Sequence, residues 1–184
     1  MSSRPSTRAM LLGLASCLAA GSSHVPYGGD PISFELKSTH FSKGSTIPQQ
    51  FTCVGADISP ALEWSAPPAN TQSFALIADD PDAPVGNWVH WVLYNLPATL
   101  RSLPQNFPKS EKASDGTLQG RNDFGKIGYG GPCPPPGKVH RYFFKLYALD
   151  AHLALNPGAS KKDLERAMQS HILAQAETMA RFSR

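Results

Sequence analysis

The alternation of apolar and polar residues predicts a chain built mainly from short β-strands. Residues 32–37 alternate strictly, as a strand does when one of its faces is buried and the other is exposed. Residues 59–64 form a short extended segment that precedes a proline-rich turn. Further strands are expected where β-forming residues run between turn residues, at residues 73–79, 87–96 and 139–149.

The pattern changes near the C-terminus. Ser160 and Asp163 resemble a capping box that opens a helix. After them, apolar residues recur every three or four positions, at Leu164, Met168, Ile172, Ala176, Met179 and Phe182. We therefore expect a C-terminal helix that packs on the sheet. Strands followed by one helix predict a mostly β fold, an antiparallel β-sandwich with a C-terminal helix.

Residues 1–25 have the features of an export signal rather than of a folded segment. Arg4 and Arg8 precede an apolar stretch, residues 10–20, that is too short to span a bilayer. Residues 14–17, which end at Cys17, resemble the lipobox of bacterial lipoproteins, and ordinary cleavage near Ala19 or Ala20 is equally open. We expect residues 1–25 to be a leader and tether of the signal or lipoprotein type.

One domain is expected over residues 26–184, because the chain has the length of a single domain. After export it would lie in the periplasm or cell envelope, and the cytoplasm is the alternative. The formal net charge of +3 is too small to indicate a nucleic-acid partner. Cys53 and Cys133 form an even pair within the domain, which predicts a disulfide after export and two free thiols in the cytoplasm.

Three short strings of residues carry the candidate chemistry: residues 80–84, residues 88–90, and residues 130–134 leading into 140–142. The third string ends a region with little periodicity, residues 101–138, which we expect to be a long loop. Together the strings supply carboxylates, imidazoles, aromatic rings and prolines, at Asp80, Asp82, Pro84, Trp88, His90, Pro132, Pro134, His140 and Tyr142.

Strand parity predicts which of these side chains meet. Trp88, His90 and Tyr94 are separated by even numbers of residues and are expected on one face of their strand. His140 and Tyr142 share a face of the last strand for the same reason. If these strands are neighbours, one cavity at the sheet edge is lined by Asp80, His90, His140 and Tyr142.

Such a cavity suits a small anion. Imidazole and phenol groups supply hydrogen-bond donors, and a carboxylate beside an imidazole raises the pKa of the imidazole. Backbone N–H groups from Gly128 to Gly131 are expected to form a nest for the anion. Prolines stiffen the walls and reduce the cost of ordering on binding. The expected ligand is phosphate, a phosphorylated head group or a carboxylate.

Two kinds of site fit the sequence poorly. The aspartates and histidines lack the spacing typical of a metal site. No Gly-x-Ser-x-Gly elbow is present, and Ser65 and Ser73 have no context that would activate them as nucleophiles. Cys133 is flanked by prolines, which argues against a nucleophilic thiol. We therefore expect no metal, no cofactor and no enzymatic activity.

The strings together resemble the phosphatidylethanolamine-binding protein family, and most closely its bacterial and archaeal Raf-kinase-inhibitor-like branch. The resemblance covers residues 32–184 and extends to residues 51–53, 59–64, 120–125 and 170–174, the last of which resemble the family's helix. It implies a β-sandwich with an anion pocket at one end. The residues that match the family's pocket are Asp80, His90, His140 and Tyr142, with Pro84, Trp88 and Pro132 or Pro134 beside them.

The sequence thus predicts a non-enzymatic binding protein for a small, phosphate-like anion. The alternative is a protein-interaction regulator, such as an inhibitor of a kinase or a protease. Homodimers occur in the bacterial branch, so the resemblance leaves a homodimer open here, and the sequence names no protein partner.

Overall fold

The computed structural model describes Met1 and residues 33–184. Apart from Met1, the predicted leader and tether at residues 1–25, with Cys17, lie outside the described residues, as does the predicted start of the domain at residue 26. Among the described residues there is no helix with the length and apolar character needed to cross a membrane.

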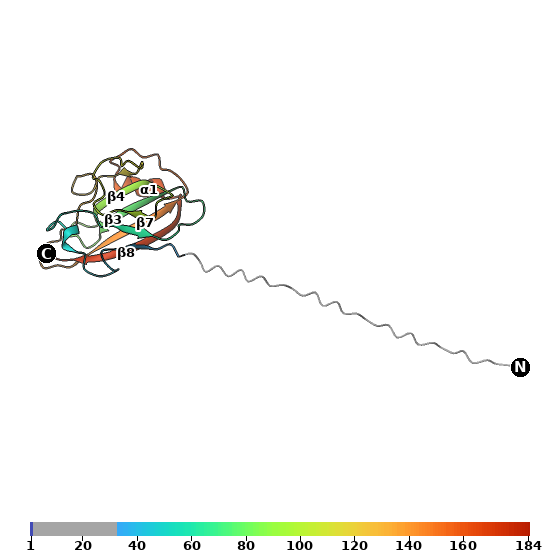
Figure 1. Cartoon of the computed structure of the whole chain (residues 1–184), viewed down its shortest axis with the longest axis horizontal. Coiled ribbons are helices and arrows are strands. Elements are labelled where there is room, and N and C mark those ends of the chain that lie inside the picture. The colour runs from blue at the N-terminus through green and yellow to red at the C-terminus, as the bar shows by residue number, and fades with distance from the viewer. Residues whose placement is uncertain (2–32) are drawn as a thin grey trace. The chain divides into compact units, whose positions relative to one another are not determined.

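Two antiparallel sheets make up the described part of the chain (Figure 1). The smaller sheet has the order β1-β2-β5 and is formed by Leu36–Ser38, Leu62–Trp64 and Ser102–Leu103. The larger sheet has the order β6-β4-β3-β7-β8 and is formed by Leu118–Gln119, Trp88–Pro97, Ser73–Asp80, His140–Leu149 and Ile172–Phe182. A short 3-10 helix, η1, spans Gln49–Phe51, and α1 spans Lys161–Met168.

The larger sheet is buried on both faces. Its inner face packs on the smaller sheet in a core that joins Leu62 and Trp64 to Leu76 and Phe144. Its outer face is covered by Leu164 of α1 and by neighbouring residues of the loop before it. All eight residues of β3 are therefore buried, which explains why its sequence is an apolar run rather than an alternating one. The predicted antiparallel β-sandwich is confirmed.

The predicted long C-terminal helix is wrong beyond its first two turns. The capping box of Ser160 and Asp163 is present and opens α1, but α1 ends at Met168. The chain then turns, and Ile172–Phe182 forms β8, which pairs with β7 along its whole length. Residues 170–174, which resemble the family's helix, are accordingly a turn and the start of this strand.

The error has a physical cause. A spacing of four residues returns a side chain to the same face of a helix and also of a strand, because four is a multiple of two. The side chains of β8 that are buried follow a period of two, at Ala176, Thr178, Ala180 and Phe182. Pairing with β7 then outweighs the helical preference of this segment.

A β-bulge in β4 changes the predicted strand parity. Ala78 pairs with Trp91 and Asp79 pairs with Val89, so His90 has no partner on β3. This extra residue leaves His90 and Trp91 on the inner face and reverses the parity beyond them. Tyr94 consequently packs on the outer face, in the cluster with α1, and not beside His90 as parity predicted.

The region of residues 101–138 is mostly loop, with only β5 and β6 as regular elements. A disulfide joins Cys53, next to η1, to Cys133 in this loop, with a Cα–Cα distance of 5.4 Å. Hydrogen bonds run alongside it, from the N–H of Cys53 to the oxygen of Pro132 (3.1 Å) and from the hydroxyl of Tyr129 to the oxygen of Phe51 (2.8 Å). The predicted cysteine pair is present, and it fixes one end of the loop.

Candidate functional site

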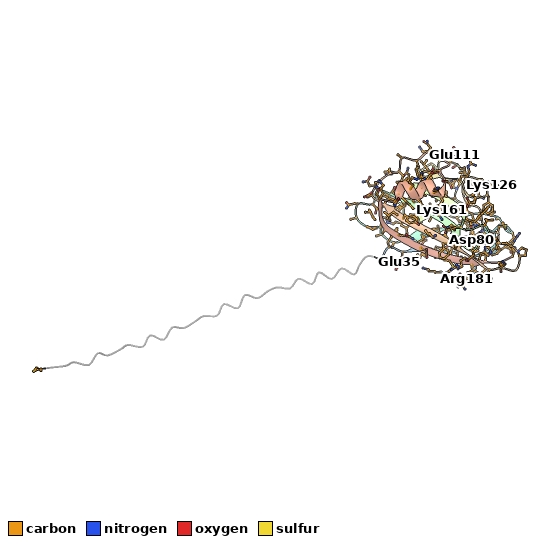
Figure 2. The ribbon with its side chains drawn as sticks, turned by 180° about the vertical axis from the view of Figure 1, so that it is seen from behind. Glu35, Asp80, Glu111, Lys126, Lys161 and Arg181 are labelled. Atoms are coloured by element: carbon orange, nitrogen blue, oxygen red, sulfur yellow. A yellow bond between two sulfur atoms is a disulfide. The ribbon has the colours of Figure 1, made fainter. Side chains whose placement is uncertain are left out.

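A pocket of about 220 Å³ opens where β3, β4 and β7 meet the long loop. Asp80 at the end of β3 and His140 at the start of β7 lie at the same end of the sheet as Arg181 near the end of β8 (Figure 2). We call this the Asp80 pocket, and it is lined by Asp80, Ala83, Pro84, Val85, Trp88, His90, Phe124, Cys133, Pro134, Pro135 and His140. Six of the nine predicted site residues are thus brought together.

Asp80 and His140 form a buried pair in the pocket. Nδ1 of His140 lies 2.7 Å from Oδ2 of Asp80, and both side chains are less than 5% exposed. The other carboxylate oxygen, Oδ1, accepts a hydrogen bond from the N–H of Asp82 at 2.9 Å. Because the carboxylate accepts, Nδ1 is the protonated nitrogen of His140, and Nε2 is the nitrogen left for another group.

His90 is held by the long loop. Its Nδ1 lies 2.6 Å from the carbonyl oxygen of Gly130, whose own N–H donates to the oxygen of His90 at 2.9 Å. Burial lowers the pKa of His90, and the Gly130 carbonyl and the charge of Asp80 only partly offset this effect. His90 is therefore a neutral imidazole at neutral pH, with Nδ1 protonated and Nε2 carrying a lone pair.

The aromatic walls are fixed by perpendicular ring contacts. The ring of Phe124 lies 5.4 Å from Trp88 and 5.4 Å from His90, measured between centroids. Asn122 builds the turn that presents Phe124, because its Oδ1 accepts from the N–H groups of Phe124 and Lys126. A Cβ atom on Gly130 would lie 2.7 Å from the Phe124 ring, so a glycine is needed for this close approach.

Tyr142 supports the pocket from behind rather than lining it. Its ring stands perpendicular to His90, with 5.2 Å between centroids, and lies 6.5 Å from the ring of His140. Burial and the charge of Asp80 raise the pKa of Tyr142 well above its ordinary value. Its hydroxyl is buried and makes no hydrogen bond within the described residues.

Asp82 and Pro132 do not line the Asp80 pocket. The carboxylate of Asp82 is engaged by Arg141, whose Nε and Nη2 donate to it at 2.9 and 2.7 Å. This pairing lowers the pKa of Asp82 to about 2. Pro132 is buried and receives the N–H of Cys53, whereas Pro134 and Pro135 form the wall. Of the two prolines that the resemblance left open, Pro134 is therefore the one in the pocket.

Two amide groups of the expected glycine nest are already bonded within the protein. The N–H of Gly130 donates to the oxygen of His90, and the N–H of Gly131 donates to Oδ1 of Asp57 at 2.6 Å. These amide groups therefore position the loop. The carbonyl of Gly130 serves the site, because it holds the imidazole of His90.

Sequence reasoning missed two features of this region. Asp79 is buried on the outer face, where Lys145 and Lys161 contact its carboxylate at 2.8 and 2.6 Å. Phe124 lines the pocket, and the only signal for it was an aromatic residue inside a turn-rich segment of the family resemblance. Among the described residues, no group of three or more His, Cys, Asp or Glu side chains is arranged to hold a metal ion.

Known proteins with similar sequences cover most of the chain. A UPF0098 protein of Methanothermobacter thermautotrophicus is 49% identical over 149 residues, which are 81% of this chain and 98% of that protein. A UPF0098 protein of Aquifex aeolicus is 51% identical over 152 residues, which are 82% of this chain and 88% of that protein.

Solved structures show the same fold. A putative phosphatidylethanolamine-binding protein homologue of Chlamydia trachomatis superposes with a TM-score of 0.76 and 39% identity, and the match covers 84% of this chain and 99% of that one. YbcL of E. coli, described as a new member of the mammalian PEBP family, has a TM-score of 0.76 and 34% identity over 82% of this chain and 98% of its own. The model of the phosphatidylethanolamine-binding protein family matches residues 37–183, and with these relatives it shows that the chain belongs to that family.

Proposed function

We propose that this protein binds a small anion, phosphate or a phosphorylated head group, in the Asp80 pocket and does not act as an enzyme. The observation that carries the proposal is the buried pair of Asp80 and His140, 2.7 Å apart. Asp80 occupies Nδ1, so Nε2 is the nitrogen of His140 that is left for the ligand. The anion binds the imidazolium form of His140, whose Nε2–H donates a charge-assisted hydrogen bond to it.

The rigidity of the walls supports binding. Pro84, Pro134 and Pro135 line the pocket, and the disulfide of Cys133 holds the loop that carries two of them. The side chain of Arg184 adds a further tie, since its Nε donates to the oxygen of Pro134 at 2.6 Å. A pocket that is already ordered loses less conformational entropy when a ligand binds.

The composition of the lining supports a binding role over catalysis. The residues that line the Asp80 pocket include no hydroxyl side chain, and the sulfur of Cys133 is held in the disulfide. The Asp80–His140 pair therefore has no neighbouring serine, threonine or free thiol to activate. A screen for phosphatase and esterase activity is expected to give no turnover, and turnover that Asp80→Asn abolishes would overturn this part of the proposal.

The binding proposal is tested by titrating inorganic phosphate and phosphoethanolamine into the purified protein while recording NMR spectra of the histidine rings. We expect the signals of His90 and His140 to shift, and His140→Ala to weaken binding at least about tenfold. The matched control is His171→Ala, because His171 and Asp150 form a second Asp–His pair, 2.8 Å apart, on the surface. Saturation with both ligands without any change at His90 and His140 would overturn the proposal.

We further propose export to the periplasm or cell envelope. The disulfide between Cys53 and Cys133 supports this location, since such bonds persist in oxidising compartments and are rare in the cytosol. Mass spectrometry of the mature protein tests it. Export predicts a mature N-terminus inside residues 10–30, with a lipid on Cys17 if the lipobox is used, and an intact N-terminus in cytoplasmic protein would overturn it.

A further inference from the structure

The hydrogen-bond partners of the two imidazoles determine what each offers to a ligand. Nδ1 of His90 faces the Gly130 carbonyl at 2.6 Å, and Nδ1 of His140 faces the Asp80 carboxylate at 2.7 Å. Both partners accept and neither donates, so each Nδ1 carries a hydrogen. In both rings Nε2 is consequently the nitrogen that remains for a molecule in the pocket.

The two Nε2 atoms differ in character. His90 is 4% exposed, and its carbonyl partner brings no net charge, so a second proton on its ring would be poorly compensated. His140 instead has the Asp80 carboxylate in direct contact with its Nδ1. In the proposed complex, where an anion binds the imidazolium form of His140, the pocket presents a lone pair at His90 and an N–H donor at His140.

The charged groups around the two rings are consistent with this difference. His90 is influenced by Asp80 from β3, by Asp79 on the outer face and by Asp123 of the loop, but burial outweighs all three. Tyr142 of β7 packs against both rings. Close to His140, Asp82 and Arg141 are paired with each other, and Lys138 and Arg181 line a surface pocket that His140 also lines.

Few other donors reach the pocket. The N–H groups of Gly130 and Gly131 are already bonded within the loop. Trp88 lines the pocket, and its ring contacts Phe124. The set of polar groups is therefore mixed, with a donor at His140 and an acceptor at His90.

We propose that the pocket, within the binding function proposed above, selects tetrahedral anions that retain one acidic hydrogen, namely monoprotonated phosphate and phosphomonoesters, over phosphodiesters and sulfate. The P–OH group donates to Nε2 of His90, and a P–O⁻ oxygen accepts from Nε2–H of His140. A phosphodiester and sulfate have only acceptor oxygens near neutral pH, so one of them meets the lone pair of His90. A site built to pair with a hydroxyl discriminates strongly against an analogue that lacks it.

Isothermal titration calorimetry on the full chain tests the selection with four probes: inorganic phosphate, phosphoethanolamine, glycerophosphoethanolamine and sulfate. We expect the first two to bind at least about tenfold more tightly than the phosphodiester and sulfate at pH 6. Equal affinity for all four probes would overturn the selection and leave the proposed anion site intact. Absence of binding by all four would overturn the proposed function together with the selection.

The pH dependence supplies a second readout. A phosphomonoester loses its remaining acidic hydrogen around pH 6, whereas a diester has none to lose. The ratio of affinities for phosphoethanolamine over glycerophosphoethanolamine is therefore expected to fall between pH 5.5 and pH 7.5. A ratio that stays constant or rises would contradict the proposal.

The variant His90→Asn tests which atom is responsible. The shorter side chain can still donate to Gly130 but has no atom at the position of Nε2. We expect the preference for phosphate over sulfate to fall to nearly one in His90→Asn and to stay unchanged in the surface control His171→Asn. An undiminished preference in His90→Asn would overturn the role of His90, and the four-probe comparison on the unmodified protein does not depend on this variant.

Discussion

Asp79 and Asp80 are adjacent in the chain, yet their carboxylates lie on opposite faces of the larger sheet. Asp80 faces the pocket and holds His140, whereas Asp79 faces α1 and binds Lys145 and Lys161. The alternation of side chains in a strand separates the two groups, and the end of β3 places one of them at the edge of the sandwich. One dipeptide therefore contributes both to the Asp80 pocket and to the attachment of the helix.

The Asp79 carboxylate is predicted to stabilise the fold without affecting the pocket. Asp79→Asn removes the carboxylate that Lys145 and Lys161 share, at side-chain exposures of 24% and 18%, and leaves Lys161 only the 3.6 Å contact with Glu165. We expect a loss of about 3 kcal/mol in the free energy of unfolding, measured in urea, with phosphate affinity unchanged. The control is Asp82→Asn, because Arg141, the partner of Asp82, is half exposed. This variant should lose less than about 1 kcal/mol in the free energy of unfolding. A cost for Asp79→Asn no larger than that of the control would contradict the prediction.

His90 is predicted to make stability depend on pH. Its pKa in the folded protein lies below the ordinary value of 6.5, because burial disfavours the charged ring. The unfolded chain therefore takes up a proton at a higher pH than the folded protein does. The stabilisation is fully present above pH 6.5 and is lost as the pH falls through the folded pKa, at up to about 1.4 kcal/mol per pH unit.

Urea unfolding at pH 7.5, 6 and 5 measures this effect. The unmodified protein should lose more free energy of unfolding between pH 7.5 and pH 5 than His90→Asn does, because the variant has no ring to protonate. His171→Asn again serves as the control for a surface imidazole. Parallel pH profiles of the unmodified protein and His90→Asn would show that His90 is not responsible.

The disulfide is predicted to contribute substantially to stability. Cys53 and Cys133 are 80 residues apart, and closing a loop of that length reduces the entropy of the unfolded chain by the equivalent of roughly 4 kcal/mol. The double variant Cys53→Ser with Cys133→Ser should lose a comparable free energy of unfolding. In denatured protein, reduction should expose two additional thiols, and identical thiol counts before and after reduction would rule out the bond.

Substitutions in β8 can distinguish the observed strand from the helix that the sequence predicted for this segment. In the strand, Thr178 is 2% exposed and Met179 is only half-buried, whereas the helical stripe would bury Met179 and expose Thr178. We expect Thr178→Glu to cost more than about 2 kcal/mol of stability, because it buries a charge without a partner. Met179→Glu should cost less, and the reverse order in thermal or urea unfolding would support the helix.

The sequence predicted most strands of the larger sheet and several of the residues that line the Asp80 pocket. β3, β4 and β7 have long apolar runs bounded by turn residues, and such runs specify strands by local pattern alone. Asp80, His90 and His140 were identified because strand ends and strand parity place polar groups in predictable positions. Cys53 and Cys133 were paired by counting, since they are the two cysteines of the domain.

Only the tertiary structure decided the features that depend on partners distant in the chain. The bulge at His90 turns Tyr94 to the other face, and a bulge is defined by the register with β3 rather than by the sequence of β4. Ile172–Phe182 is a strand because β7 offers it a full set of hydrogen bonds, although its spacing fits a helix equally well. The tautomer of His90 likewise follows from the Gly130 carbonyl, 40 residues along the chain. Local pattern therefore determined most of the strands, and long-range pairing determined the remaining strand and which atoms face the Asp80 pocket.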